Sequence, residues 1–456
     1  MTTLSMPAYL EWPALLLAAT VLLLLTYAWS SLRRECIYAV LLGALALYGA
    51  TTLAQLPDLA ADFSASAVQA AALVFAIGSV CLVVAIVLGE ALLGTRRSSP
   101  MWSRRLAEGA RVHASWSVAF GVASLALFLI GNRTFEMTWS EARDGDGLVA
   151  AAATFLLLLS FPGIVAAWRA RRPTAASVLV IINGVGFLLS GSRAAVLGAL
   201  AYLAWGYVLA HESAVRRLLR IAGLAMIAVG FHVLLRFARG MTVVDLWAAV
   251  RSGGLLEMLA TSPATSDLSG GEFAIAKYFV FAVQTASAEV YGFMTSAVRL
   301  LLILVPSSVV TSVNKPIDVT YLLWAEAYSQ NLFAEAEGQA LLREFFESGV
   351  YGSVHPTLFG ELFAAGLWPS LIASSGVIGL FCVFINRCLS WIDPKAAVLV
   401  LGPVLVGMWM VARGNSVIGF GYFVYLTIFA VVLIRLQTLA SASVRQCAAP
   451  QGQDQQ

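Results

Sequence analysis

Lysine is almost absent from this chain, and charged residues of all kinds make up only 12% of its 456 residues. A soluble globular chain usually carries about 25% charged residues. Here 60% of the residues are hydrophobic and the mean hydropathy is +0.85, a composition that predicts an integral membrane protein. The net charge of +3 is too small to indicate a nucleic-acid-binding protein.

Cysteine is also sparse, with five residues and no C-x-x-C pair, which argues against a zinc site. The topology derived below places every cysteine in a membrane helix or on the cytoplasmic side, which argues against a disulfide framework. A cleavable signal peptide with a basic n-region is missing too. The first apolar run, 9–30, is too long for the apolar region of such a peptide, so we expect it to span the membrane.

Long apolar runs are abundant, and a spanning helix needs about 20 mostly apolar residues. Eight candidate spans precede a long segment, 237–360, and three follow it. They are 9–30, 36–56, 67–93, 112–131, 148–168, 174–191, 194–210, 218–236, 362–386, 396–412 and 416–434. The sequence therefore predicts an all-α polytopic integral membrane protein with about 11 transmembrane helices.

The basic residues, nearly all arginines, indicate the orientation of these spans. Most of them fall in alternate connections, such as those that contain Arg33 and Arg34, Arg169 to Arg172, or Arg216 to Arg220. By the positive-inside rule these connections are cytoplasmic, which puts the N-terminus outside and the C-terminus inside. The long segment 237–360 is then extracytoplasmic.

Four units follow from this topology. They are an N-terminal bundle of eight helices (1–236), a large loop region (237–360), a C-terminal three-helix segment (361–436) and a disordered tail (437–456). Two apolar runs in the loop, 273–285 and 293–310, could form another spanning hairpin. We expect them instead to be interfacial or re-entrant helices.

Four arginines lie on the side that the positive-inside pattern avoids. At about 1.5 Å per helical residue, Arg193, Arg236 and Arg413 each lie roughly 27–30 Å beyond a cytoplasmic basic residue. Arg239 follows Arg236 on the same helical face. Each could simply reach toward the lipid headgroups. As a group at one depth they suit the phosphate or pyrophosphate of a lipid-linked substrate.

The stretch "GVYGSVHPTLFGELFAAG", 349–366, places two ionisable residues where the chain enters the membrane. We expect Pro356 in the first turn of a helix. His355 would then lie at the positive end of the helix dipole, where a neutral imidazole is favoured and can accept a proton as a general base. It could instead cap the helix or contact a loop. Glu361, with Thr357 on its face, could act as a base or form a structural bridge with an arginine.

Short motifs add a resemblance to a known family. "SGSRAAVLGAL" before the long segment, "VPSSVVTSVNKP" within it, "HPTLFGELFAAG" at its exit and "ARGN" in a later turn resemble Wzy-type O-antigen polymerases, which join oligosaccharide repeat units and are related to the O-antigen ligases. The resemblance implies a GT-C-like bundle in the bacterial inner membrane, with a large periplasmic loop, a periplasmic N-terminus and a cytoplasmic C-terminus.

The reaction that this resemblance implies transfers a growing glycan from undecaprenyl pyrophosphate to a sugar hydroxyl of another undecaprenyl-pyrophosphate-linked repeat unit. Donor and acceptor are thus both lipid-linked oligosaccharides, met in membrane lipid, and a chain-length regulator is compatible as a further partner. No nucleotide sugar, cofactor or metal is implied. The sequence agrees, because the nearest match to a D-x-D metal motif is "DGD" at 144–146, which we interpret as a solvated turn.

Roles for the candidate residues follow from this chemistry. The leaving pyrophosphate needs fixed cations, for which Arg193, Arg236, Arg239 and Arg413 are the candidates. His355 is the first choice for the base that activates the acceptor hydroxyl, and Glu361 is the second.

Further substrate contacts are expected from the long loop and its exit. It contains aromatic and acidic residues that suit sugars, although aromatics also gather at membrane interfaces. The candidates are Lys315, Tyr351 and Thr357.

Two other functions remain open. An O-antigen ligase, which transfers the glycan to a lipid A core, would use the same donor with a different acceptor. A flippase or transporter of lipid-linked sugars would be expected to have charges near the bilayer midplane and repeated halves. The middle parts of the predicted spans are nearly free of charge, which favours a one-sided enzyme over a transporter.

Overall fold

The structure is a computed structural model of the chain, and thirteen helices are described in it. The residues described are 8–93, 114–131, 147–161, 163–164, 167, 172–190, 223, 242–254, 274–286, 298, 302, 319–329, 355–391, 394–416, 419–421, 428 and 432. Within these ranges the fold is helical and contains no β-strand, as the sequence predicts.

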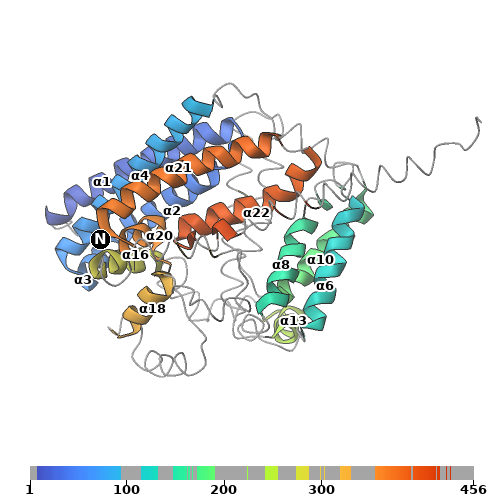
Figure 1. Ribbon diagram of the computed structural model, residues 1–456. Helices are drawn as coiled ribbons and strands as arrows, with labels where there is room; N and C mark the ends of the chain where they lie inside the picture. The colour runs from blue at the N-terminus through green and yellow to red at the C-terminus, as the bar shows by residue number, and fades with distance from the viewer. Residues whose placement is uncertain are drawn as a thin grey trace, which may run out of the picture.

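The helices keep one set of labels throughout (Figure 1). They are α1 (Ala8–Arg33), α2 (Ala39–Ala54), α3 (Leu56–Asp62), α4 (Ala65–Leu93), α6 (Ala114–Ile130), α8 (Gly147–Ser160), α10 (Pro173–Ser190), α13 (Val243–Arg251), α16 (Ala274–Thr285), α18 (Val319–Ser329), α20 (Thr357–Ala364), α21 (Leu367–Trp391) and α22 (Pro394–Arg413).

Three described helices are long and apolar enough to cross a membrane, namely Tyr9–Arg33, Ala65–Leu93 and Leu367–Leu389. A fourth span results if α2 and α3, which meet at a bend of 65°, are counted together. Shorter apolar helices include Ser117–Ile130, Pro173–Phe187 and Val404–Arg413. These helices indicate a membrane-embedded protein, whereas the predicted count of about 11 spans is not confirmed.

Several predicted spans lie partly or wholly outside the described residues. Both 194–210 and 218–236 do so, apart from residue 223, as does most of 416–434. In the long segment, α16 has 12 residues and is about 18 Å long, too short to cross a bilayer alone. Its length favours the re-entrant interpretation of the first apolar run. Of the run 293–310, only residues 298 and 302 are described.

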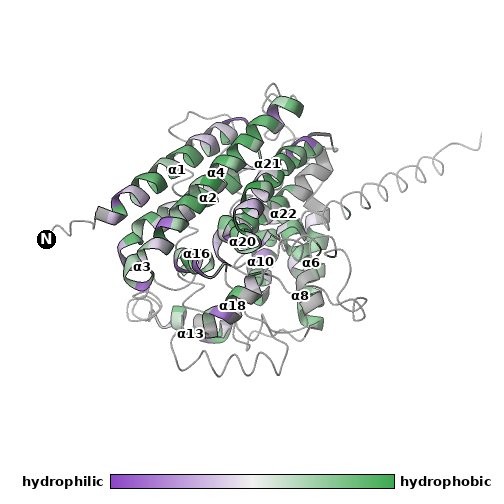
Figure 2. Cartoon of the chain, turned by 60° about the vertical axis from the view of Figure 1, so that its left-hand side comes forward, coloured by the Kyte–Doolittle hydropathy of each residue, from purple (hydrophilic) through white to green (hydrophobic). Residues whose placement is uncertain are grey.

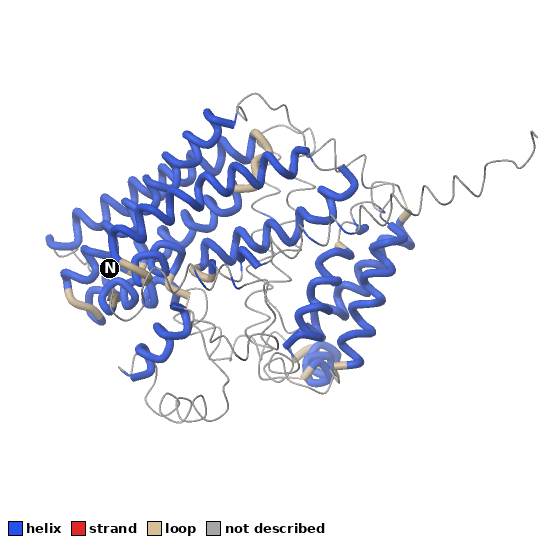
Figure 3. The backbone as a smooth tube through the Cα atoms, viewed as in Figure 1, coloured by secondary structure: helices blue, strands red, loops and turns tan. Residues whose placement is uncertain are grey.

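The helices form two groups, which Figure 3 shows as two sets of rods. The larger contains α1, α2, α4, α16, α20, α21 and α22, and the smaller contains α6, α8 and α10. Leu158 of α8 packs against Val406 and Met410 of α22 and joins the two groups. The C-terminal helices α20, α21 and α22 share a separate and larger hydrophobic cluster with α1, α2 and α4.

Helices α4 and α21 lie side by side and run in the same direction. A Cβ atom added at Gly379 would meet Leu82 and Ala85, and one added at Gly89 would meet Val383, so the contacts advance along both chains together. Small residues at these points allow close backbone approach, as in other membrane helix pairs. Leu88 of α4 and Val377 of α21 are exposed, and Figure 2 shows apolar stretches along both helices.

Polar contacts hold the helix ends of the larger group. Where α1 ends and α2 begins, Arg34 forms a 2.7 Å ion pair with Glu90 of α4, which also accepts a hydrogen bond from Tyr38. Nearby, the Asn386 side chain of α21 accepts a hydrogen bond from the Ile37 N–H at 3.1 Å. All these residues belong to the end that the sequence predicts to be cytoplasmic.

A single methyl group at Gly379 tests the α4–α21 contact. A Cβ there would lie 2.7 Å from the Leu82 carbonyl oxygen, whereas a Cβ at Gly376, one turn earlier, would meet nothing within 4 Å. Overpacking of this kind costs about 1–3 kcal/mol, against a gain of about 1 kcal/mol from replacing a helical glycine. We expect G379A to lower the thermal unfolding midpoint in detergent and G376A to preserve or raise it. Equal midpoints for the two variants would contradict the contact.

Candidate functional site

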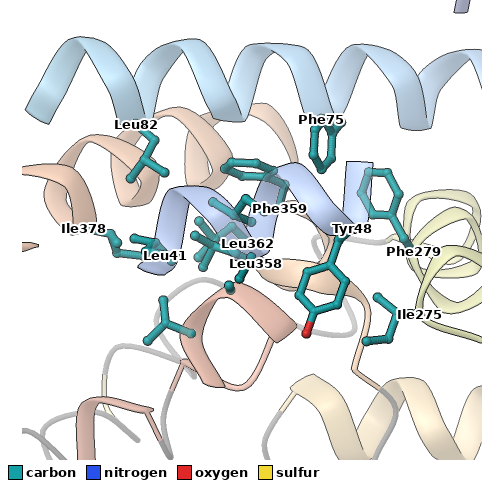
Figure 4. Packing of buried hydrophobic residues seen from close by; sticks show 14 of the residues in the cluster. Leu41, Tyr48, Phe75, Leu82, Ile275, Phe279, Leu358, Phe359, Leu362 and Ile378 are labelled. Carbon is teal, nitrogen blue, oxygen red and sulfur yellow. The ribbon is translucent and has the colours of Figure 1, made fainter. Parts of the chain in front are cut away.

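Helix α20 is a short helix buried on every side. All its residues, from Thr357 to Ala364, are buried among α2, α4, α16, α21 and α22. The helix is apolar almost all round, which is typical of a core helix. Figure 4 shows Phe359 against Phe75 of α4, with ring centroids 5.4 Å apart, and Leu358 and Leu362 near Leu41.

The chain breaks between α20 and α21, which the sequence did not predict. It placed Glu361 directly before one span, 362–386, whereas the structure ends α20 at Ala364 and begins α21 at Leu367, which has a φ of +57°. Non-helical backbone of this kind is tolerated at membrane depth where protein surrounds it. Glu361 therefore belongs to a separate buried helix.

The start of α20 also differs from the prediction. Pro356 is the N-cap residue and not part of the first turn, because the helix begins at Thr357. Thr357 is fully buried and has a φ of +64°, which is an outlier for a β-branched side chain. Such strain persists only where the surrounding structure holds it.

The end of α22 lies directly against this strained residue. Gly414 has a φ of +89°, and a Cβ added to it would lie 2.5 Å from the Thr357 carbonyl oxygen. Only glycine fits such a place. The contact brings the segment 355–361 and the segment 413–416 together, although more than fifty residues separate them in the sequence.

Glu361 fixes the same junction through hydrogen bonds. Its carboxylate accepts one from the Ser416 hydroxyl at 2.6 Å and one from the Ser416 N–H at 3.0 Å. Glu361 is 4% exposed and Ser416 is 6% exposed. The sequence offered an arginine as the structural partner of Glu361, and that stays a prediction. The hydrogen bonds described above come from Ser416, three residues after Arg413. A buried carboxylate held in this way is stabilised and ties α20 to the end of α22.

His355 and Arg413 flank the junction and are more accessible than Glu361. Both side chains are partly exposed. His355 Nδ1 and Arg413 Nε are buried, so the exposed surface belongs to other atoms of each residue. Arg413 is in the last turn of α22, where a cation also complements the helix dipole. His355 and Arg413 can therefore reach a substrate, whereas Glu361 is enclosed.

The structure brings together four of the predicted site residues, which are His355, Thr357, Glu361 and Arg413. The remaining five lie outside the described residues, namely Arg193, Arg236, Arg239, Lys315 and Tyr351. No group of three or more His, Cys, Asp or Glu side chains in the described ranges is placed to hold a metal ion.

Sequence reasoning missed Ser416 and Gly414. The motif "ARGN" was noted for its arginine, but Gly414 matters because it makes room for Thr357, and Ser416 because it satisfies Glu361. A glycine directly after the last residue of a helix was a usable signal, since such positions favour a left-handed backbone. Nothing local pointed to Ser416.

Comparisons of this chain with protein-family models, with curated proteins and with solved structures find no match.

Replacing Ser416 tests whether its hydroxyl supports the junction. Hydrogen bonds to charged groups contribute about 1.5–3 kcal/mol. We expect S416A to lower the thermal unfolding midpoint in detergent.

Ser370 provides the matched control, because its hydroxyl is buried and has no hydrogen-bond partner in the described part of the chain. S370A should therefore leave the midpoint unchanged or raise it. Equal losses in S416A and S370A would show that the Glu361 hydrogen bond adds nothing to stability.

Proposed function

We propose that this chain is a polyprenyl-pyrophosphate-dependent glycosyltransferase of the bacterial inner membrane. It polymerises undecaprenyl-pyrophosphate-linked repeat units into an O-antigen or a related surface polysaccharide on the periplasmic face. The observation that carries this proposal is the junction of α20 and α22, where His355 and Arg413 flank the buried hydrogen bond between Glu361 and Ser416. The family resemblance of the same two motifs supports it.

In the proposed reaction His355 and Arg413 have complementary tasks. The acceptor sugar hydroxyl gives its proton to the neutral imidazole and attacks the anomeric carbon of the donor glycan. The bond from that carbon to the pyrophosphate oxygen breaks, and undecaprenyl pyrophosphate leaves with the electron pair. Arg413 stabilises the charge that develops on the pyrophosphate, as expected of a fixed cation. Arg193, Arg236 and Arg239 are proposed for the same task.

Burial separates the two candidate bases. Glu361 is 4% exposed and already accepts hydrogen bonds from Ser416. A general base must come within hydrogen-bond reach of the acceptor hydroxyl. His355 is partly exposed, so it is the proposed base, and Glu361 is proposed as a positioning residue that holds the end of α22. The positions of these residues do not distinguish a polymerase from a ligase, because both use the same donor.

Arg413 is tested by its replacement with alanine in an assay with purified protein and a defined lipid-linked repeat unit. Losing a charge-assisted contact of about 1.5–3 kcal/mol corresponds to roughly a tenfold or greater loss of rate. We expect R413A to leave mostly single repeat units.

Arg33 is the control, because it lies at the end of α1 and over Trp29, in the connection predicted to be cytoplasmic. R33A should polymerise normally. Long chains at the normal rate from R413A would remove Arg413 from the site. In a parallel reaction of the wild-type protein supplied with a lipid A core, transfer to that core without polymerisation would favour the ligase.

The role of His355 is tested by the pH dependence of the rate. A base must be neutral, so the wild-type rate should fall as acid protonates the imidazole. In H355Q we expect a much lower rate and no such acidic limb. An unchanged rate and profile would exclude His355 as the base. The profile of E361Q should keep the wild-type acidic limb, because Glu361 is assigned no proton transfer.

A further inference from the structure

Helix α13 is a short helix that its own sequence stabilises. The Thr242 hydroxyl accepts a hydrogen bond from the Asp245 N–H, and the Asp245 carboxylate accepts one from the Thr242 N–H, both at 3.1 Å. This reciprocal pair is a capping box, which satisfies donors that the first turn leaves open. The turn 252–254, in which Gly253 has a φ of +73°, follows the helix. The nine residues of α13 therefore form a defined element.

One face of α13 is apolar and exposed. Val244, Trp247 and Val250 are 54%, 67% and 46% exposed, and their spacing of three places them along one side of the helix. Ala249 is buried on the other side. Arg251 is exposed at the end of the same face. An exposed apolar stripe that contains a tryptophan and ends beside an arginine is unusual for a surface in contact with water.

The direction of α13 suggests what covers this face. In Figure 1 the long helices of both groups run within the plane of the picture, whereas α13 is viewed nearly end-on, as Figure 3 also shows. Helix α13 thus runs across the direction of the apolar helices. An element that runs across the spanning helices lies along the membrane plane and does not cross the membrane.

We propose that α13 lies in the lipid headgroup interface, with Val244, Trp247 and Val250 facing the acyl chains and Arg251 beside a lipid phosphate. Tryptophan is enriched at this depth because its ring is apolar and its N–H is polar. Arginine reaches the phosphates from the same position. Interfacial helices of this kind bury an apolar face by about 5–10 Å. The sequence predicted interfacial helices only within 273–310, and α13 lies outside that range. Its placement does not depend on the proposed reaction.

The placement has a consequence for the long segment. Helix α13 begins shortly after the predicted span 218–236 and opens the region 237–360. An interfacial α13 would fix the start of that region at the membrane surface. Lipid-linked pyrophosphates lie at the same depth, so the region would begin where such a substrate arrives.

The test uses the full-length protein in nanodiscs of phosphatidylethanolamine and phosphatidylglycerol. Nitroxide labels are attached to V244C, W247C and S252C, each in a variant whose five native cysteines are replaced by alanine and which remains monodisperse in gel filtration. Asp245 is left in place because it forms the capping box. Collision with oxygen, which concentrates in lipid, is compared with collision with a water-soluble nickel chelate. We expect labels at 244 and 247 to favour oxygen and the label at 252, in the exposed turn after the helix, to favour nickel.

Two results would overturn the proposal. Preference for nickel at all three positions would show that the face is in water. Protection from both reagents at 244 and 247 would show that a protein segment or a second copy of the chain covers it. A further label at V250C should show the same preference for oxygen as the label at 244 if the whole face enters the lipid.

Discussion

A carboxylate that is enclosed by apolar helices must find hydrogen-bond donors, and the need of Glu361 for donors organises the candidate site. Ser416 supplies both its hydroxyl and its N–H, at 2.6 and 3.0 Å. To do so, the chain must leave α22 at Arg413 and turn at once toward α20. Gly414 makes that turn possible, because its positive φ and missing side chain admit the Thr357 carbonyl. The hydrogen bonds of Ser416, the turn at Gly414 and the contact with Thr357 thus all accompany one buried carboxyl group.

The rigid junction has a functional meaning in the proposed reaction. His355 precedes α20 and Arg413 ends α22, so the orientation of each is determined by elements that the core holds. Phe359 of α20 packs against Phe75 of α4, which also contacts Phe279 of α16, and these contacts hold α20 in place. Catalytic groups on such a support need little reorganisation when charge develops. In the proposed reaction Glu361 then contributes by holding the end of α22 and not by proton transfer.

The sequence predicted the apolar helices well and the site only in part. Runs of apolar residues located α1, α4, α6, α10 and α22 to within a few residues, because length and composition decide whether a helix can span a membrane. They could not reveal the break after Ala364. Helix α20 is apolar on nearly all sides, so its pattern merges with that of α21, and the positive φ of Leu367 has no local signal.

The sequence could predict the candidate site only in part, because the site is formed by contacts between residues that are distant in the chain. The motif containing His355 and Glu361 was identified by its ionisable residues at a membrane entrance. Its pairing with Ser416, 55 residues away from Glu361, depends on how α20 and α22 pack, which periodicity does not encode. A buried carboxylate implies a partner, and sequence composition suggested arginine because charge was the only visible complement. The structure adds the hydroxyl and backbone N–H of Ser416, which the sequence did not suggest, and the arginine partner stays a prediction.

The most direct test of this account is a structure of the protein bound to a non-transferable analogue of a lipid-linked pyrophosphate oligosaccharide. We expect the pyrophosphate to lie against the Arg413 guanidinium and the acceptor side of the sugar to face His355, with the Glu361 carboxylate still hydrogen-bonded to Ser416. Release of Glu361 from Ser416, with its carboxylate against the sugar and His355 turned away, would contradict it.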